Sequence, residues 1–164
     1  MEQALGTAMR TYQRSVDAFD EAAAIYMGVN RTDMRCLDVL LEQGQATPGH
    51  LAGALGLTTG SVTAMLDRLE KLQYVERSPD PADRRRIQVR PTGQAVALAR
   101  RLWGPLVEEG GRGLARYSKA ELELLIEVLR QTQALQEAHT ERIRGMRRDS
   151  RSDGKKGARR PGSR

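Results

Sequence analysis

Residues 47–92 read TPGHLAGALGLTTGSVTAMLDRLEKLQYVERSPDPADRRRIQVRPT, and this stretch decides the predicted fold. Thr47 offers an oxygen that can cap a helix, Pro48 suits a first helical position, and Gly56 suits a helix end. The Thr58–Thr59 pair follows directly, and either hydroxyl can cap a second helix. The stretch therefore begins with two short helices joined by a tight turn.

The second predicted helix has two unlike faces. Its apolar residues recur at spacings of three and four, which gathers them on one core-facing stripe: Val62, Met65, Leu66, Leu69 and Leu72. The opposite face is small and polar, so it can approach base edges in the major groove of DNA. An ordinary solvated helix face is the alternative. The residues predicted to read bases are Thr59, Gly60, Thr63 and Ala64, and those predicted to contact phosphates are Ser61, Arg68 and Lys71.

A β-hairpin is predicted after the two helices. Its strands begin at residues 75–77 and return at residues 87–89, where apolar and polar residues alternate. The connection SPDPADRRR is an exposed turn because of its prolines and aspartates. Consecutive arginines repel one another unless an anion is near, and DNA phosphates or a narrow minor groove supply one. A solvated hairpin is the alternative. Asp83 is predicted to brace one of the three DNA-contacting arginines, Arg84, Arg85 and Arg86.

These residues resemble the MarR family of bacterial transcription regulators. The resemblance runs through LGLTTGSVTAMLDRLEKLQYVER and PDPADRRRIQVRPTGQA, and its motifs are Asp67-Arg68-Leu69 and Asp83-Arg84-Arg85. The family often carries arginine where this chain has Ala64, and Leu-Thr where it has Pro91-Thr92. The resemblance implies a winged helix-turn-helix, a two-fold homodimer and a pseudo-palindromic operator in double-stranded DNA.

Predicted helices on both sides of this winged-helix lobe have apolar faces that one chain cannot cover. The lobe takes about residues 30–92 of a single predicted domain, residues 1–144. The flanking helices take about residues 3–28 and 92–144, and so long an amphipathic helix must pack on a partner. Self-association as a homodimer would cover them. The predicted class is mainly α with a small β-hairpin wing.

Local signals set the predicted helix boundaries. Thr32 is predicted to cap the helix that precedes the lobe's helix pair. Gly104-Pro105 should bend or break the helix after the wing, because proline removes a hydrogen bond and crowds the previous turn. Ser118 and Glu121 form a capping box for a final helix, which is predicted to run to about Arg144.

The charge of the chain is concentrated at its end. The 164 residues carry a net charge of +6, and residues 145–164 contain eight basic and two acidic residues, so they account for the whole excess. This segment has almost no apolar residue and is predicted to be a disordered basic tail that attracts DNA without sequence preference. A solubilising tail is the alternative. No apolar run is long enough to span a membrane, so a soluble, cytoplasmic protein is expected.

The resemblance also implies an effector site between the dimer-forming helices and the DNA-binding lobe. Effectors of this family are small and often phenolic, and they act by favouring one spacing of the two recognition helices. Ordinary core and rim positions are the alternative interpretation for every candidate. The candidate ligand-binding residues are Tyr26, Met27, Arg31, Met34, Asp38 and Met65.

The sequence contains few residues that could serve in catalysis or hold a cofactor. His50 and His139 are expected at the surface, and no enzyme, metal or cofactor is predicted. Cys36 is the only cysteine, which excludes a disulfide within the chain, and its apolar neighbours predict a small buried side chain. Redox regulation through Cys36 is the alternative. Family members that sense oxidants carry their cysteine in the first helix, where this chain has none.

Three functions remain, in order of preference. The first is a dimeric, sequence-specific repressor that a small ligand releases from its operator. The second is an architectural protein that binds all DNA sequences with nearly equal affinity. The third is a winged-helix module that binds proteins and has no DNA role.

Overall fold

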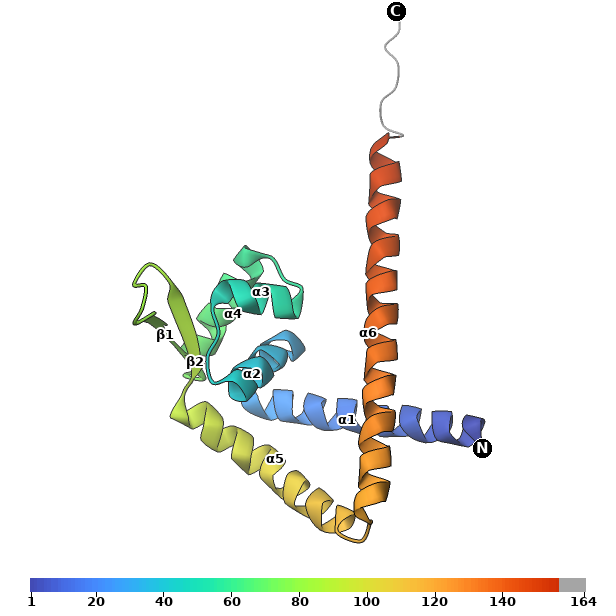
Figure 1. Cartoon of the computed structure of the whole chain (residues 1–164). Helices are drawn as coiled ribbons and strands as arrows, with labels where there is room; N and C mark the ends of the chain where they lie inside the picture. Colours follow the sequence, from blue (N-terminus) through green and yellow to red (C-terminus); the bar gives the residue numbers. More distant parts are fainter. Residues whose placement is uncertain (157–164) are drawn as a thin grey trace, which may run out of the picture. The chain divides into compact units, whose positions relative to one another are not determined.

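The computed structural model describes the backbone of residues 1–156 and the side chains of residues 1–146. The chain forms two compact units, residues 1–108 and the part that begins at Glu109. Helices dominate both units, and a two-stranded antiparallel hairpin belongs to the first (Figure 1). The elements in chain order are α1 (Glu2–Met27), α2 (Arg31–Gln43), α3 (Pro48–Leu55), α4 (Thr59–Lys71), β1 (Val75–Pro79), β2 (Ile87–Pro91), α5 (Gly93–Leu114) and α6 (Lys119–Lys156).

Helix α3 begins and ends where the sequence predicts, and α4 begins where it predicts. The Thr47 hydroxyl oxygen accepts a hydrogen bond from the backbone N–H of His50 at 3.2 Å, and Pro48 occupies the first turn of α3. Gly56 ends α3 with a φ of 67°, in the left-handed region that glycine tolerates. Thr58, one of the two candidate caps, accepts from the N–H of Ser61 at 3.3 Å and begins α4.

The predicted cap of α2 is wrong by two residues. Asn30, and not Thr32, lies at the N-cap, and its side-chain oxygen accepts from the N–H groups of Thr32 and Asp33, both at 2.9 Å. The Asp33 carboxylate accepts in return from the Asn30 N–H at 3.3 Å. This reciprocal capping box satisfies more of the free N–H groups at the helix start than Thr32 could alone.

The core of the first unit lies where α2, α3, α4 and the hairpin meet. Its fully buried side chains include Leu40, Leu51 and Val89, one from each of three elements. The predicted α4 stripe is buried except for Leu72, which caps the end of the helix and is partly exposed. The buried Tyr74 hydroxyl donates to the Met27 carbonyl oxygen at 3.0 Å, which ties the end of α1 to the base of the hairpin.

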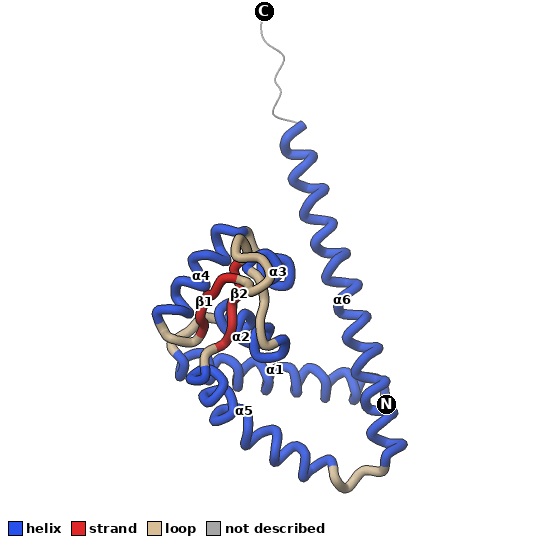
Figure 2. Tube along the Cα trace, turned by 60° about the vertical axis from the view of Figure 1, so that its left-hand side comes forward, coloured by secondary structure: helices blue, strands red, loops and turns tan. Residues whose placement is uncertain are grey.

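The hairpin pairs β1 with β2 in the predicted antiparallel arrangement. Arg77 lies opposite Val89, and the loop between the strands covers residues 80–86. Val89 also exchanges two backbone hydrogen bonds with Ala46, of 2.8 and 3.0 Å, on its other side. Figure 2 shows the two strands beside the helices of the lobe, with the loop at their free end. We call the hairpin, residues 75–91, the wing.

The predicted break in the helix after the wing is wrong. Helix α5 is continuous from Gly93 to Leu114, with Pro105 inside it, and the glycines of residues 110–113 are helical as well. Pro105 cannot donate to the Arg101 carbonyl four residues earlier, so one intrahelical bond is missing there. The flanking turns maintain the helix despite that loss.

Helix α6 begins as predicted and continues further than predicted. The Glu121 carboxylate accepts from the N–H and the hydroxyl of Ser118, each at 2.7 Å, and forms the expected capping box. The helix reaches Lys156, so residues 145–156 are helical where the sequence predicted the start of the tail. The remaining predicted tail, residues 157–164, lies outside the described residues. No helix in the described part of the chain is both long enough and apolar enough to cross a membrane.

Candidate DNA interface and effector pocket

The predicted base-reading face of α4 is exposed in the structure. We call it the α4 outer face, and all its members are solvent-accessible: Thr59, Gly60, Ser61, Thr63, Ala64 and Lys71. The Thr63 hydroxyl donates to the Thr59 carbonyl at 3.1 Å, so its oxygen can still accept hydrogen bonds. A methyl group added at Gly60 would meet no atom within 4 Å. The fold therefore does not require a glycine there, and this face is open to close approach by another molecule.

Asp80 organises the tip of the wing. Its carboxylate accepts from the Gln88 side-chain amide at 2.7 Å and from the backbone N–H groups of Ala82 and Asp83 at 2.8 and 3.3 Å. These hydrogen bonds, with the Gln88 bond the strongest influence, lower the pKa of Asp80. The carboxylate of Asp83 accepts from the Arg85 N–H at 3.0 Å, so the predicted brace is a backbone contact.

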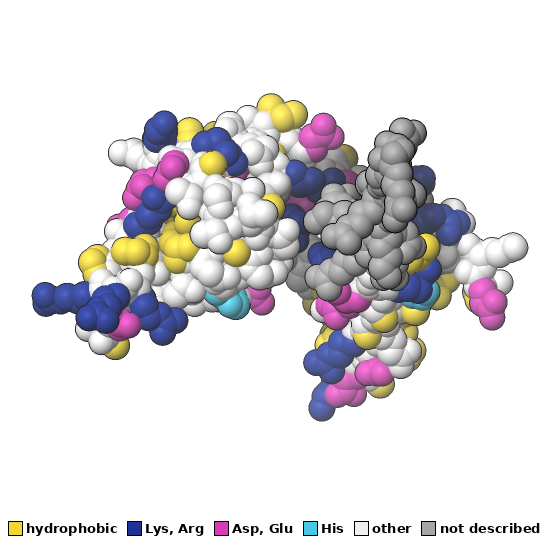
Figure 3. Space-filling view, turned by 90° about the horizontal axis from the view of Figure 1, so that it is seen from above, with side chains coloured by type: hydrophobic (Ala, Val, Ile, Leu, Met, Phe, Trp, Pro, Cys, Tyr) yellow, Lys and Arg dark blue, Asp and Glu magenta, His cyan; other side chains and the backbone are white. Residues whose placement is uncertain are grey.

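The arginine cluster of the wing, Arg84, Arg85 and Arg86, is exposed at the loop tip. None of the hydrogen bonds or ion pairs found among the described residues occupies a guanidinium group of this cluster. Figure 3 shows Lys and Arg side chains gathered at the left edge of the molecule, where the wing lies in Figure 1. The charge of Arg86 also helps to lower the pKa of Asp80, but three neighbouring guanidinium groups with no direct hydrogen bond or ion pair form a site suited to phosphate.

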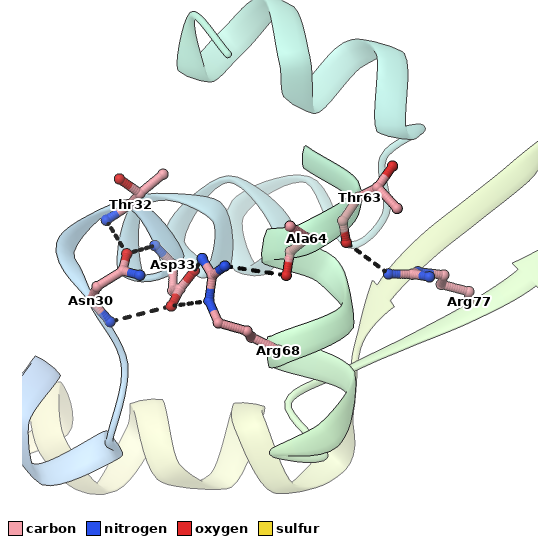
Figure 4. A network of polar contacts seen from close by, with 7 residues as sticks. All are labelled: Asn30, Thr32, Asp33, Thr63, Ala64, Arg68 and Arg77. Atoms are coloured by element: carbon pink, nitrogen blue, oxygen red, sulfur yellow. Dashed lines mark hydrogen bonds and ion pairs between the residues drawn. The ribbon is translucent and has the colours of Figure 1, made fainter. Parts of the chain in front are cut away.

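Arg68, predicted to contact phosphate, lies in a different environment. Its Nη2 donates to Asp33 Oδ1 at 2.7 Å and its Nη1 to the Ala64 carbonyl at 3.2 Å (Figure 4). The hydrogen bond to Asp33 raises the pKa of Arg68, which stays protonated. The structure thus separates Arg68 from the wing arginines, since its charge already has a partner.

Arg77, which the sequence did not single out, connects the wing to α4. From β1 its guanidinium pairs with Asp67 at 2.6 Å and with Glu70 at 3.7 Å, and Nη2 lies 3.4 Å from the Thr63 carbonyl. Its buried Nε donates no hydrogen bond within the described part of the chain. Arg77 therefore neutralises two carboxylates of α4 that would otherwise repel phosphate beside the outer face.

A pocket of about 260 Å³ lies between α1, α2 and α5, where the effector site is expected. Three predicted ligand residues, Met27, Met34 and Asp38, line it, together with Trp103 and other apolar side chains. Burial, followed by the nearby carboxylate of Asp20, raises the pKa of Asp38. The pocket is thus mainly apolar, with one carboxyl group at its rim.

The other three predicted ligand residues lie elsewhere. Arg31 lines a second pocket of about 530 Å³ between α1 and α2, which Met34 and Asp38 also line, and it pairs there with Asp17 at 2.7 Å. Tyr26 is 58% exposed, with the Arg101 guanidinium 5.9 Å above its ring. Met65 is 1% exposed in the core. Tyr26 and Met65 line neither of these two pockets, so the sequence pattern did not separate core and surface positions from pocket walls.

Comparison with known proteins identifies the family of the chain. A family model described as MarR family matches residues 29–87. YcgE, an uncharacterised HTH-type transcriptional regulator of Bacillus subtilis (strain 168), is 39% identical over 126 residues, which cover 77% of this chain and 82% of that protein. The chain belongs to the MarR family. It is a transcriptional regulator with a DNA-binding winged helix, and its family is not one of enzymes.

Solved structures share this MarR-family fold. RV1404 from Mycobacterium tuberculosis has a TM-score of 0.64 at 22% identity, covering 80% of this chain and 92% of that chain. A mutant of S. aureus MepR, solved bound to an oligodeoxyribonucleotide, has a TM-score of 0.57 at 19% identity, covering 79% and 96%. Similarity at these identities concerns the fold.

In this MarR-family chain, the interactions that sequence reasoning missed join residues that are far apart in the sequence or lie on different elements. Asp33 and Arg68 are 35 positions apart, and Arg77 and Asp67 are 10 apart on different elements. Asn30 followed by Asp33 is a capping-box pattern, so the N-cap of α2 had a local signal. No local sequence pattern predicts which arginine pairs with Asp33, the carboxylate of this capping box.

Proposed function

We propose that this MarR-family chain is a homodimeric, sequence-specific repressor that a small apolar ligand releases from a pseudo-palindromic operator. The observation that carries the proposal is the arginine cluster, which lies exposed at the tip of the wing, with no direct hydrogen bond or ion pair to its guanidinium groups among the described residues. The exposed α4 outer face lies in the same compact unit. A helix that reads bases and a basic hairpin that holds phosphates together supply specificity and affinity.

The DNA-contacting residues of the proposal fall into two groups. The α4 outer face approaches base edges through Thr59, Gly60, Thr63 and Ala64, while Ser61 and Lys71 approach phosphates. The arginine cluster binds the backbone of the flanking DNA or its minor groove. The MepR mutant solved with an oligodeoxyribonucleotide has the same fold, which supports a DNA partner for this chain.

The proposed homodimer rests on apolar side chains that remain exposed in the described chain. They occur in α1, at the end of α5 and along α6, and include Leu5, Tyr12, Leu114, Leu124, Leu125, Ile126, Leu129 and Leu135. So many exposed leucines are unusual for a folded subunit that remains alone. Two-fold symmetry then requires two half-sites about 10 base pairs apart between centres.

Selection of bound fragments from random DNA tests sequence specificity. We expect the full chain to enrich one inverted repeat, which it prefers over scrambled DNA by roughly a thousandfold or more. Equal affinity for all fragments would indicate the architectural protein instead, and no enrichment would indicate the protein-binding module.

A triple substitution tests the wing. Arg84→Ala, Arg85→Ala and Arg86→Ala together should abolish binding to the selected duplex at moderate salt. The slope of log affinity against log salt should fall by about 1 for each arginine that contacts a phosphate. The control removes three exposed arginines elsewhere, by Arg10→Ala, Arg14→Ala and Arg100→Ala, and should retain binding, because bulk charge is not the cause.

The ligand part of the proposal concerns the pocket between α1, α2 and α5. Its volume of about 260 Å³ and its apolar walls fit a small neutral aromatic molecule, and a phenol whose hydroxyl reaches Asp38 is the preferred class. Ala99→Leu should fill the pocket and abolish the ligand-dependent loss of DNA binding. Ala97→Leu, an exposed position on the same helix, is the control and should leave the response intact.

A further inference from the structure

The guanidinium group of Arg68 is directed into the protein, although the residue lies on an exposed side of α4. Besides the Nη2 bond to Asp33 Oδ1, Nε lies 3.4 Å from Asp33 Oδ2, so both carboxylate oxygens face the guanidinium. Nη1 donates to the Ala64 carbonyl of the same helix. Each of the three nitrogens therefore contacts a protein acceptor, as Figure 4 shows. We call the Asp33–Arg68 contact the helix clamp.

Asp33 is far more buried than Arg68, and this difference indicates the role of the helix clamp. The Asp33 side chain is 3% exposed, whereas that of Arg68 is 48% exposed. A buried carboxylate has lost its hydration and needs a charged partner within hydrogen-bond distance. The free protein therefore requires Arg68 at this place whether or not DNA is bound.

The clamp joins two elements at fixed points. Asp33 is held by the capping box in the first turn of α2, a helix whose Leu37 and Leu40 are buried in the core. Arg68 lies in the C-terminal half of α4, one turn beyond Ala64 of the outer face. The contact thus fixes the position of α4 along and about its axis relative to α2. Direct readout needs such a fixed position, since contacts to base edges tolerate little displacement.

We propose that Arg68 is a positioning residue, whose ion pair with Asp33 fixes α4 against α2 and so sets sequence specificity, and that it is not a phosphate contact. This inference rests on the proposed DNA-binding function and deepens it. It replaces the assignment of Arg68 to phosphate that the sequence alone favours. The other predicted contacts of the α4 outer face and of the arginine cluster keep their roles.

Asp33→Asn separates the two roles because they predict opposite results. The asparagine oxygen can still accept from Asn30, so the capping box is retained while the charge is lost. A positioning Arg68 loses its partner, and affinity for the selected duplex should fall by about tenfold, with a smaller fall on scrambled DNA. A phosphate-binding Arg68 would be released toward DNA, and affinity would stay equal or rise. That second result would overturn the proposal.

Arg68→Gln adds a second measurement, the salt dependence of DNA affinity, which a loss of protein stability does not change. A phosphate contact contributes about 1 to the slope of log affinity against log salt, so its loss would lower the slope by about that amount. The proposal predicts an unchanged slope and a reduced ratio of specific to non-specific affinity. A slope lowered by 1 with an unchanged ratio would overturn it.

Arg68→Lys provides the second variant if Asp33→Asn fails to fold at the assay temperature. Lysine preserves the charge for a phosphate, but it cannot present two parallel donors to Asp33. The proposal predicts a reduced specificity ratio, and full retention of that ratio would overturn it.

A matched control breaks an ion pair of equal length elsewhere in the same unit. Asp17→Asn removes the partner of Arg31, whose pair also spans 2.7 Å but lies at the surface, and should leave both affinity and ratio unchanged. All measurements use the full chain and the duplex that it selects. Loss of binding in the wing triple variant tests the proposed function separately, so equal binding by Asp33→Asn would defeat the positioning role alone.

Discussion

Two aspartates organise the candidate DNA-binding surface: one is buried in the core and the other lies at the surface. Asp33 is buried and holds a helix through a charged partner, whereas Asp80 lies at the surface and holds a loop through amide donors. Both carboxylates accept several hydrogen bonds at once, from backbone N–H groups and from a side chain. Asp33 thus fixes the position of α4, and Asp80 fixes the conformation of the wing tip.

The lowered pKa of Asp80 predicts how the wing responds to acid. Because folding favours the ionised carboxylate, its contacts are complete above the ordinary pKa of 3.8 and are lost as the pH falls through the lower folded value. The amide proton resonances of Ala82 and Asp83 should therefore titrate with a midpoint below 3.8. Asp80→Asn should remove this transition, and a midpoint at or above 3.8 in the unsubstituted chain would contradict the prediction.

Cys36 is predicted to be inert in the folded protein. Its side chain is 0% exposed, and burial, followed by the charge of Asp33, raises its pKa from 9.0 to about 12. The reactive thiolate is therefore suppressed. Ellman's reagent should label the thiol only after denaturation, and Cys36→Ala should keep DNA binding. Rapid labelling of the native protein, accompanied by loss of DNA binding, would revive the redox alternative.

The same shift predicts a stability change at alkaline pH. The folded state holds the thiol proton more tightly than the unfolded state, so its stabilising effect is complete below pH 9.0 and declines as the pH rises toward about 12. The free energy of unfolding should fall by about 1.4 kcal/mol between neutral pH and about pH 10 from this group alone. Urea titrations of Cys36→Ala at both pH values should show a smaller fall in the free energy of unfolding than the unsubstituted chain shows. An equal fall would contradict the prediction.

At the scale of helices and strands, the sequence predicted best what neighbouring residues decide. The caps at Thr47, Thr58 and Ser118 depend on residues within one turn, and so does the turn at Gly56. The pairing of the wing depends on two short strands that are close in the sequence. The predicted cap of α2 was wrong because Asn30 and Thr32, two positions apart, can both cap the helix, and the hydrogen bond that Asp33 accepts from the Asn30 N–H favours Asn30. The predicted break in α5 was wrong because the one hydrogen bond that Pro105 removes does not end a helix of 22 residues.

Sequence periodicity predicted the exposed face of α4 but not the roles of individual residues on it. Arg68 and Lys71 look alike in the pattern, since both are cations on the polar side of the helix. Only the fold brings Asp33 to one of them, and only the hairpin register brings Arg77 to Asp67. Partner choice over 35 positions follows from tertiary packing, which the periodicity of a single helix does not encode.

Helix α5 offers a prediction from its internal proline. Pro105→Ala restores an N–H that can donate to the Arg101 carbonyl and relieves crowding in the preceding turn. The free energy of unfolding should rise by as much as about 3 kcal/mol, the usual cost of proline inside a helix. Chemical denaturation measures the change. A neutral or destabilising effect would mean that packing of the proline ring outweighs the missing hydrogen bond.

At the scale of the whole molecule, exposed leucines predict assembly. Leu125 and Leu129 are one helical turn apart on α6, and both are half exposed. Replacing both with Glu would place two charges in the proposed dimer interface, so sedimentation should show a monomer with weakened operator binding. Ala120→Glu and Ala134→Glu add the same charge to exposed positions on the opposite side of the helix and should stay dimeric. A dimer that persists with Glu at both leucine positions would contradict this interface.

Trp103 packs edge-to-face against Phe19, with ring centroids 5.8 Å apart, and also lines the pocket between α1, α2 and α5. It is the sole tryptophan of the chain. Its emission spectrum consequently reports on one location, without the overlapping signals that complicate fluorescence in most proteins. An aromatic compound entering the pocket should quench or shift that emission, so candidate effectors can be ranked by optical titration before any operator is known.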